Sequence, residues 1–305
     1  EQVMQKINKF VTIDKCDRSV YTSDFDNVRH HIFNEMKEVD MAFAKIASSP
    51  CLGGSYADNV RVAKPDEFDL VIQLQLPDQQ LVQITYATHL PGFVKLNVAD
   101  LLKKIEKETH NAVLYKKLKT LVDDNNNLVQ AKFHQWMQSI IANVFKKYPD
   151  GKLKINGKIY EFKHSIQGPA QTLDIKVGPR RFSIDFVPAI RFPTSIWHVK
   201  RPCPIQGRNK PWVAVPKPLK DRNGGFDQDN LYWITSFVDQ ERYFIEGKQA
   251  LKPSIRLLKK LRDKHSLTNL KSYYIKTVFL WIVIEKENEN DLNFWNKGLG
   301  AIFLY

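Results

Sequence analysis

The stretch CLGGSYADNVRVAKPDEFDLVIQLQL, residues 51–76, joins a glycine–serine turn to an apolar run that opens with two carboxylates. If residues 68–76 form a strand, side chains alternate between its two faces, so Glu67 and Asp69 share one face. The opposite face then carries an apolar row: Phe68, Leu70, Ile72, Leu74 and Leu76. Because two like charges side by side repel, this pair needs a basic partner, open water or a divalent metal.

A later run, RFSIDFV at residues 181–187, places one more carboxylate on a strand. Asp185 falls on the face opposite an apolar row made of Phe182, Ile184 and Phe186. With Glu67 and Asp69 it would build an oxygen-rich site for Mg²⁺ or Mn²⁺. Two such ions about 4 Å apart activate an attacking hydroxyl and hold a triphosphate leaving group. The alternative is that each acidic side chain is solvated or paired with a base on a strand face.

The turn at Gly53, Gly54 and Ser55 favours the metal reading. Glycines let backbone amides approach phosphate oxygens without a Cβ in the way, and Ser55 adds a hydroxyl donor. A Gly-Gly-Ser run alone is usually an ordinary turn. Here it precedes the carboxylate strand. The turn, the paired carboxylates and the later Asp185 together therefore indicate a metal and phosphate site more specifically than any one of them does.

Composition sets the class of protein. The 305 residues are 43% hydrophobic and 26% charged, which is typical of a soluble globular chain, and no apolar run approaches the ~20 residues of a membrane helix. Three scattered cysteines make no metal pattern and no disulfide framework, which predicts a reducing setting, either the cytosol or the nucleus. The formal charge of +13 indicates a polyanionic partner such as nucleic acid, nucleotides or an anionic membrane, although basic charge also serves solubility.

Hydrophobic periodicity predicts one helix, then a strand-rich part, then a helical part. The first helix is expected over 22–49, with Ser23 or Asp24 as its cap. Strands are expected at 68–76, 81–87, 92–98, 152–163, 170–176 and 181–187. Helices are expected at 99–109, 127–147, 227–247, 253–265, 268–286 and 291–305, and residues 191–226 are proline-rich and loop-like.

These motifs resemble the nucleotidyltransferases of the cyclic GMP-AMP synthase type, most of all the cyclic GMP-AMP synthase-like receptors of insects that sense double-stranded RNA. The resemblance is carried by GGSYADNVRVAKPDEFDLVIQLQLP, GPAQTLDIKV, FSIDFVPAIRFP, KPWVAVPK and ALKPSIRLLKKLRDKHSLTNLKSYYIKTVFL. It implies an α+β, bilobal nucleotidyltransferase fold of the DNA polymerase β-like kind, with a mixed β-sheet catalytic lobe. We expect a long helix and the catalytic core in residues 1–190, and a loop-rich segment with a helical lobe in residues 191–305.

The resemblance assigns roles to the residues that match the family's motifs. Glu67, Asp69 and Asp185 are the implied catalytic metal ligands, and the implied cofactors are two Mg²⁺ or Mn²⁺ ions. Vertebrate cyclic GMP-AMP synthase also carries a zinc insertion of one histidine and three cysteines. Residues 227–252 contain neither residue type, so no zinc is expected.

Nucleotide contacts are implied less directly. Gly54 and Ser55 match the phosphate-binding turn, and Tyr273, with Ser272 before it, matches a tyrosine that stacks on a base. The family's phosphate-binding lysine falls at Ile255, so we nominate its neighbours Lys252 and Arg256. The guanine-reading arginine has no clean counterpart, and Arg201 and Arg208 are its candidates.

The activating ligand would bind a basic face formed by the first helix and the helical lobe. Its candidate residues, each with a solvated charge as the alternative, are Arg29, Lys37, Lys45, Lys217, Lys220, Arg222 and Lys248, with Lys252 as a further candidate. Such a face contacts phosphates without reading sequence. The absence of the zinc insertion fits an RNA duplex, which is recognised by shape, better than DNA.

The resemblance therefore implies a cytoplasmic enzyme of innate immunity that converts ATP and GTP into a cyclic dinucleotide of the cyclic GMP-AMP type. Double-stranded RNA would activate it, and assembly into oligomers on RNA is part of this expectation. Two alternatives stay open: a template-independent synthase of linear oligonucleotides, like the oligoadenylate synthases, and a non-catalytic nucleic-acid-binding member of the fold. The intact set of Gly54, Ser55, Glu67, Asp69 and Asp185 argues against the second.

Overall fold

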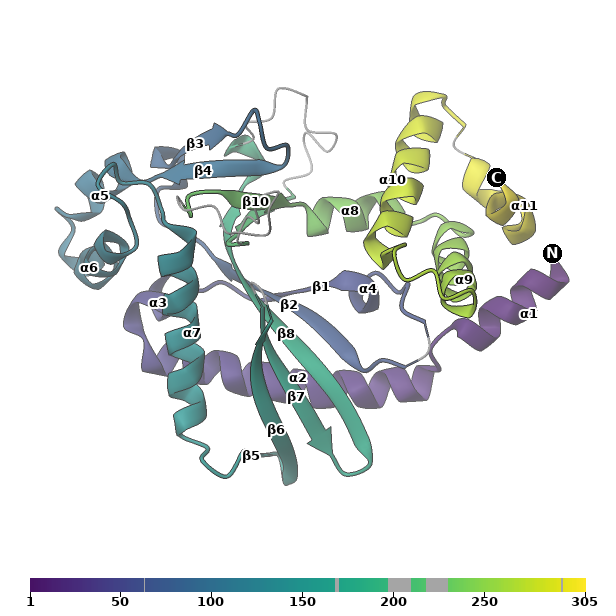
Figure 1. Ribbon diagram of the computed structural model, residues 1–305, viewed down its shortest axis with the longest axis horizontal. Coiled ribbons are helices and arrows are strands. Elements are labelled where there is room, and N and C mark those ends of the chain that lie inside the picture. Colours follow the sequence, from purple (N-terminus) through teal and green to yellow (C-terminus); the bar gives the residue numbers. More distant parts are fainter. Residues whose placement is uncertain (63, 168–169, 197–209, 218–229, 292) are drawn as a thin grey trace. The chain divides into compact units, whose positions relative to one another are not determined.

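The computed structural model of the chain describes residues 1–62, 64–167, 170–196, 210–217, 230–291 and 293–305 (Figure 1). The chain forms two compact units, which we call the sheet unit and the helical unit. The sheet unit comprises Asp24–Leu52 and Asp69–Phe237, and the helical unit comprises Glu1–Ser23, Gly53–Phe68 and Val238–Tyr305. These interleaved units differ from the expected division into 1–190 and 191–305, which stays a prediction about domains.

The described residues form one large sheet. Its strands are β1 (Cys51–Gly53), β2 (Glu67–Leu74), β3 (Gln83–Tyr86), β4 (Phe93–Asn97), β5 (Lys152–Ile155), β6 (Lys158–Gln167), β7 (Ala170–Val177), β8 (Arg180–Phe192), β9 (Trp212–Val215) and β10 (Trp233–Ser236). The order along the sheet is β3-β4-β10-β9-β8-β7-β6-β5, and β2 pairs with both β1 and β8. The long strand β8 therefore adjoins β2, β7 and β9.

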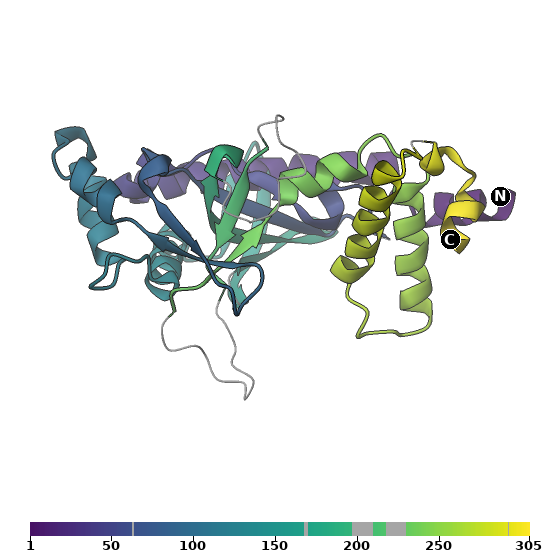
Figure 2. The same cartoon turned by 90° about the horizontal axis from the view of Figure 1, so that it is seen from above.

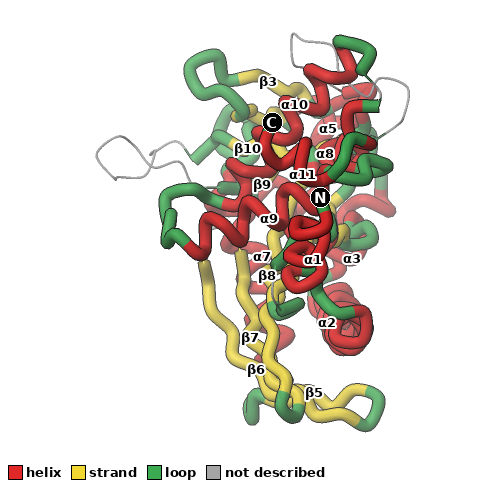
Figure 3. Tube along the Cα trace, turned by 90° about the vertical axis from the view of Figure 1, so that its right-hand side faces the viewer, coloured by secondary structure: helices red, strands yellow, loops and turns green. Residues whose placement is uncertain are grey.

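Three successive antiparallel pairings, β5–β6, β6–β7 and β7–β8, build this part of the sheet, whose strands are yellow in Figure 3. Between β5 and β6, Asn156 and Gly157 have φ values of 49° and 75°. Both lie in the left-handed region that an Asn-Gly hairpin turn requires. In the β7–β8 hairpin the register sets Thr172 opposite Asp185 and Leu173 opposite Ile184. This register brings a hydroxyl side chain next to a predicted metal ligand.

Most helices of the sheet unit lie where the sequence predicts them, but helix α2 starts earlier than expected. They are α3 (Met41–Ile46), α5 (Ala99–Ile105), α6 (Ala112–Thr120) and α7 (Gln130–Lys146), together with most of α2 (Lys15–Val39), which starts in the helical unit. The expected start of α2 was wrong: neither Ser23 nor Asp24 is its cap, because Asp24 lies inside the helix and is fully buried. The predicted single helix is interrupted at Asp40. The side chain of Asp40 caps α3 by accepting a hydrogen bond from the amide of Phe43 at 2.8 Å.

A second correction concerns residues 227–247, which were expected to be helical. Within its described part, residues 230–247, Trp233–Ser236 form strand β10, and α8 (Val238–Ile245) is the helical segment. Trp233 pairs with Val94, its ring is fully buried, and its indole N–H donates to the carbonyl of Leu128 at 3.1 Å. Sheet pairing and burial thus decide the conformation of this short segment. Helix α6 was not predicted at all.

The helical unit contains α1 (Gln2–Val11), α4 (Gly54–Ala57), α8, α9 (Leu251–Lys264), α10 (Ser272–Asn288) and α11 (Leu299–Leu304). Helices α9 and α10 lie side by side and are joined by a loop (Figure 2). Val11, Leu257 and Leu299 from three helices form one buried cluster. Short 3₁₀ helices complete the described chain: Gln79–Leu81, Thr109–Asn111, Thr194–Ile196 and Phe294–Asn296.

Strands followed by a mainly helical C-terminal part confirm the predicted α+β class. Within the described ranges, none of the helices has the length and apolarity that a membrane crossing needs.

Candidate active site

Strand β2 presents its two carboxylates as the sequence pattern predicts. Phe68, Leu70 and Ile72 are completely buried on one face. Glu67 and Asp69 lie on the other face, where Glu67 is exposed and Asp69 half-buried. Further along this second face the side chains are covered again, since Val71 is 8% exposed. The accessible part of the face is therefore confined to the start of the strand, where the carboxylates stand.

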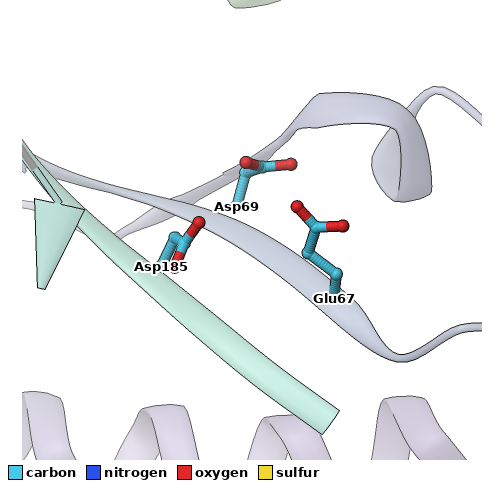
Figure 4. Close-up of side chains that lie close together, drawn as sticks. All are labelled: Glu67, Asp69 and Asp185. Carbon is cyan, nitrogen blue, oxygen red and sulfur yellow. The ribbon is translucent and has the colours of Figure 1, made fainter. Parts of the chain in front are cut away.

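Asp185 on the neighbouring strand β8 completes an acidic cluster with Glu67 and Asp69. One oxygen from each of the three carboxylates lies within 4.8 Å of the other two. Figure 4 shows the three side chains gathered on the same side of the two strands. The structure thus brings together the three residues that sequence alternation proposed as metal ligands.

Three carboxylates at this spacing fit a divalent cation. Without a counter-ion they repel one another, whereas hard cations such as Mg²⁺ and Mn²⁺ prefer oxygen ligands of this kind. When bound, such ions would lower the pKa of an attacking hydroxyl and neutralise the phosphates of a leaving group. The role of the chain is to hold the three carboxylates at one point of the sheet.

Two neighbouring side chains orient the cluster, and neither was predicted. The Thr172 hydroxyl donates to Oδ1 of Asp185 at 2.6 Å, a contact that follows from the β7–β8 register. The Arg61 guanidinium donates to Glu67 at 2.6 Å and to Asp66 at 2.7 Å. The basic partner anticipated for paired carboxylates is therefore present for Glu67. The sequence alone does not predict the role of Thr172, because the sequence of one strand does not determine its register with the next.

The glycine–serine turn lies where the sequence placed it, directly after β1. Gly54 begins the short helix α4 with φ of 67°, a backbone conformation that side chains with a Cβ rarely adopt. The carbonyl of Ser55 accepts from the amide of Val60 at 2.9 Å, which closes the loop after α4. A glycine is therefore needed here for backbone reasons as well as for any approach to phosphate.

Tyr273 and Ser272 stand at the start of α10. The ring of Tyr273 is 58% exposed, so its face is open to a ligand. Its hydroxyl donates to Glu241 on α8 at 2.9 Å. The hydroxyl of Ser272 accepts from Arg262 at 2.8 Å. An exposed aromatic ring held at its polar end is suited to stacking on a base.

Arg256 and Lys252 on α9 differ from each other in exposure. Arg256 is 6% exposed, and its guanidinium donates to Asn8 Oδ1 and to the carbonyl of Asn59. Lys252 is half-buried. Arg256 therefore ties the C-terminal half of α1 to the loop after α4. The roles of both residues in nucleotide binding stay predictions.

Several of the basic residues nominated for nucleic acid have partners within the chain. Arg29 pairs with Asp26 at 2.6 Å, and Lys248 pairs with Glu287 at 3.2 Å. Lys37 lies over the ring of Phe33 at 4.6 Å, and the exposed Lys45 donates to the carbonyl of His110. Lys217 is exposed. Two more nucleic-acid candidates, Lys220 and Arg222, lie outside the described residues. The two candidates for the guanine-reading arginine, Arg201 and Arg208, also lie outside them.

The chain matches two known protein domain families. Residues 56–247 match the Mab-21 protein nucleotidyltransferase domain, and residues 250–305 match the Mab-21 protein HhH/H2TH-like domain. The first match covers β2, β8 and the carboxylate cluster. The large sheet, the carboxylate cluster and the family match all agree with the bilobal nucleotidyltransferase fold predicted from the sequence.

Similar proteins from insects show which members of this family the chain resembles. A cyclic GMP-AMP synthase-like receptor of Lucilia cuprina is 34% identical over 308 residues, covering 100% of this chain and 78% of the relative. Cyclic GMP-AMP synthase-like receptor 1 of Drosophila melanogaster is 32% identical over 303 residues, covering 99% and 77%. A cyclic GMP-AMP synthase-like receptor of Aethina tumida is 33% identical over 315 residues, covering 100% and 75%. The chain belongs to the Mab-21 nucleotidyltransferase family, among the proteins similar to cyclic GMP-AMP synthase.

Proposed function

We propose that this protein converts ATP and GTP into a cyclic dinucleotide of the cyclic GMP-AMP type, and that double-stranded RNA activates it. The observation that carries the proposal is the convergence of Glu67, Asp69 and Asp185 to within 4.8 Å on β2 and β8. Such a cluster suits two Mg²⁺ or Mn²⁺ ions, which hold a triphosphate and activate the attacking hydroxyl. The names of the insect relatives, cyclic GMP-AMP synthase-like receptor, support the product class.

Nucleotide binding in this proposal uses the helical unit. Gly54 and Ser55 contact the phosphates, and the exposed ring of Tyr273 stacks on a base. Lys252, Arg256 and Ser272 assist. The protein acts in the cytoplasm as part of innate immune signalling.

Activation is proposed to depend on basic charge. The chain carries 46 Lys+Arg against 33 Asp+Glu, which favours binding to the phosphates of a duplex. Arg29, Lys37 and Lys45 on α2 and α3 supply part of that surface, and Lys217 and Lys248 supply more. Oligomers assemble as several copies bind one RNA duplex.

Product analysis tests the proposal. The protein is incubated with labelled ATP and GTP, Mg²⁺ or Mn²⁺, and RNA duplex, DNA duplex or neither, at one salt concentration. We expect a cyclic dinucleotide with RNA and far less with DNA or no duplex. Linear oligomers would identify an oligonucleotide synthase instead. Equal yields in all three conditions would describe a constitutive enzyme, and no product under any condition would contradict catalysis.

A further inference from the structure

A buried ionic network in the helical unit joins Asp58, at the end of α4, to residues of α8 and α10. Figure 1 labels the three helices. At its centre, Nζ of Lys276 lies 2.6 Å from Oδ2 of Asp58 and 2.8 Å from Oε2 of Glu241. Arg242 approaches Oδ1 of Asp58 at 3.5 Å. Asp58 is 1% exposed, and the Lys276 side chain is 11% exposed. Arg242 also lies 3.8 Å from Oδ1 of Asp239, so three carboxylates share two cations in this network.

Lys276 stays charged in this setting. Burial alone would lower the pKa of Lys276, but the negative charges of Glu241 and Asp58 and hydrogen bonds to both raise it above its ordinary value. A charged lysine shared by two carboxylates is a firm connection, because withdrawing it would leave both carboxylates without their central partner.

Each carboxylate leads to a different part of the proposed nucleotide site. Glu241 accepts the phenol hydrogen of Tyr273 through Oε1 while its other oxygen faces Lys276. Asp58 directly follows α4, and its amide donates to the carbonyl of Gly54 at 3.2 Å. One ammonium group thus holds both Glu241, which anchors Tyr273, and Asp58, which follows α4.

We propose that Lys276 is a positioning residue for nucleotide binding. Through Glu241 it fixes the phenol of Tyr273, and hence the plane of the exposed ring that stacks on a base. Through Asp58 it fixes the end of α4, and hence the backbone of Gly54 and Ser55 that contacts phosphate. The inference rests on the proposed function, and it adds a residue that contacts no nucleotide itself.

Nucleotide affinity measured apart from turnover separates positioning from simple stabilisation. The full chain is titrated calorimetrically with α,β-methylene-ATP and Mg²⁺, a probe that cannot transfer its nucleotidyl group, well below the unfolding midpoint. Lys276→Met is expected to weaken binding about tenfold, as supporting residues around other sites do. Lys276→Arg, which keeps a cation with several donors, should restore affinity to within about threefold of wild type. The exposed lysine Lys260 on α9 gives the matched control, Lys260→Met, with unchanged affinity.

A double-mutant cycle with Tyr273→Phe tests the route through Glu241 and does not depend on a buried substitution alone. Tyr273→Phe keeps the ring and removes its hydroxyl, so we expect a loss of affinity in the wild-type background and little further loss beside Lys276→Met. Additive losses, or wild-type affinity in Lys276→Met despite a lowered unfolding midpoint, would overturn the inference. If Lys276→Met fails to fold, wild-type affinity in Tyr273→Phe overturns it. No binding by the wild-type protein would instead overturn the proposed nucleotide site, and this inference with it.

Discussion

A hydroxyl on the next strand helps to orient Asp185. Thr172 is 5% exposed and donates to Asp185 at 2.6 Å, so this hydrogen bond supports the carboxylate before any ion arrives. Residues that support metal ligands in this way tune both the geometry and the basicity of the ligand. Glu67 has its own support in Arg61, at 2.6 Å.

Replacing Thr172 by valine keeps the shape of the side chain and removes its hydrogen bond. We expect Thr172→Val to weaken Mn²⁺ binding and to lower turnover by about tenfold, because the Asp185 carboxylate then loses a hydrogen bond that supports its orientation. Mn²⁺ affinity is measured by electron paramagnetic resonance and turnover by product formation. Thr85→Val, an exposed position on β3, is the control. Wild-type values for both quantities in Thr172→Val would show that the hydroxyl has no role in the site.

At the scale of elements, helix α2 is fastened to the sheet by a buried carboxylate. Asp24 accepts hydrogen bonds from Lys158 at 2.8 Å, from Tyr160 at 3.1 Å and from Arg180 at 2.7 Å. Burial alone would raise the pKa of Asp24, but these three donors hold it below the ordinary value of 3.8. The contact joins α2 to β6 and β8, the strand that carries Asp185.

The sign of the resulting pH dependence follows from the lowered pKa. The stabilisation is complete above the unfolded-state pKa and is lost as pH falls through the folded-state pKa, because the unfolded chain takes up the proton first. Asp24→Asn should therefore lower the free energy of unfolding by about 3 kcal/mol at pH 7, with a smaller difference from wild type at acid pH. Urea unfolding at pH 7 and pH 3.5 measures both. The exposed Asp17→Asn on the same helix is the control, and an equal effect of the two substitutions would contradict the role of Asp24.

Some elements could be predicted from the sequence and others could not, and the difference has physical reasons. Strands β2 and β8 were predicted because strict alternation repeats over each strand, and the acidic cluster followed from that alternation and the family resemblance. Strand β10 was missed because its four residues depend on partners in β4 and β9 that are distant in sequence. The start of α2 was missed because Asp24 looks like a helix cap but is a buried ion-pair residue. Thr172 and Lys276 were missed because contacts between elements fix their roles.

At the scale of the whole molecule, the net charge of +13 favours the proposed association with polyanions. Binding to duplexes should weaken steeply as salt rises, because phosphate contacts release counterions. Binding alone does not explain activation, which needs a part of the chain with two arrangements of different affinity for the ligand. Helix α2, which carries Arg29 and Lys37, is the element we propose for this role.

Charge reversal on α2 tests that role. Arg29→Glu with Lys37→Glu should abolish stimulation by RNA duplex and leave the basal, Mn²⁺-supported activity in place. The control is Lys103→Glu on α5 with Lys107→Glu in the turn that follows it, which changes the net charge equally at two exposed lysines. Product yield is measured with and without RNA at one salt concentration. Equal losses of stimulation in the two double variants would mean that net charge, and not helix α2, is responsible.

The central claim is that the cluster of Glu67, Asp69 and Asp185 performs metal-dependent nucleotidyl transfer, and one comparison tests it directly. Asp185→Asn removes one charged ligand without changing side-chain size, and Asp174→Asn makes the same change at an exposed position on the adjacent strand β7. Both variants and the wild-type protein are assayed for cyclic dinucleotide with labelled ATP and GTP, Mn²⁺ and RNA duplex. The account predicts wild-type yield from Asp174→Asn and a loss of about a hundredfold or more from Asp185→Asn, since metal ligation supplies several kcal/mol to such reactions. Undiminished product from Asp185→Asn would contradict the account.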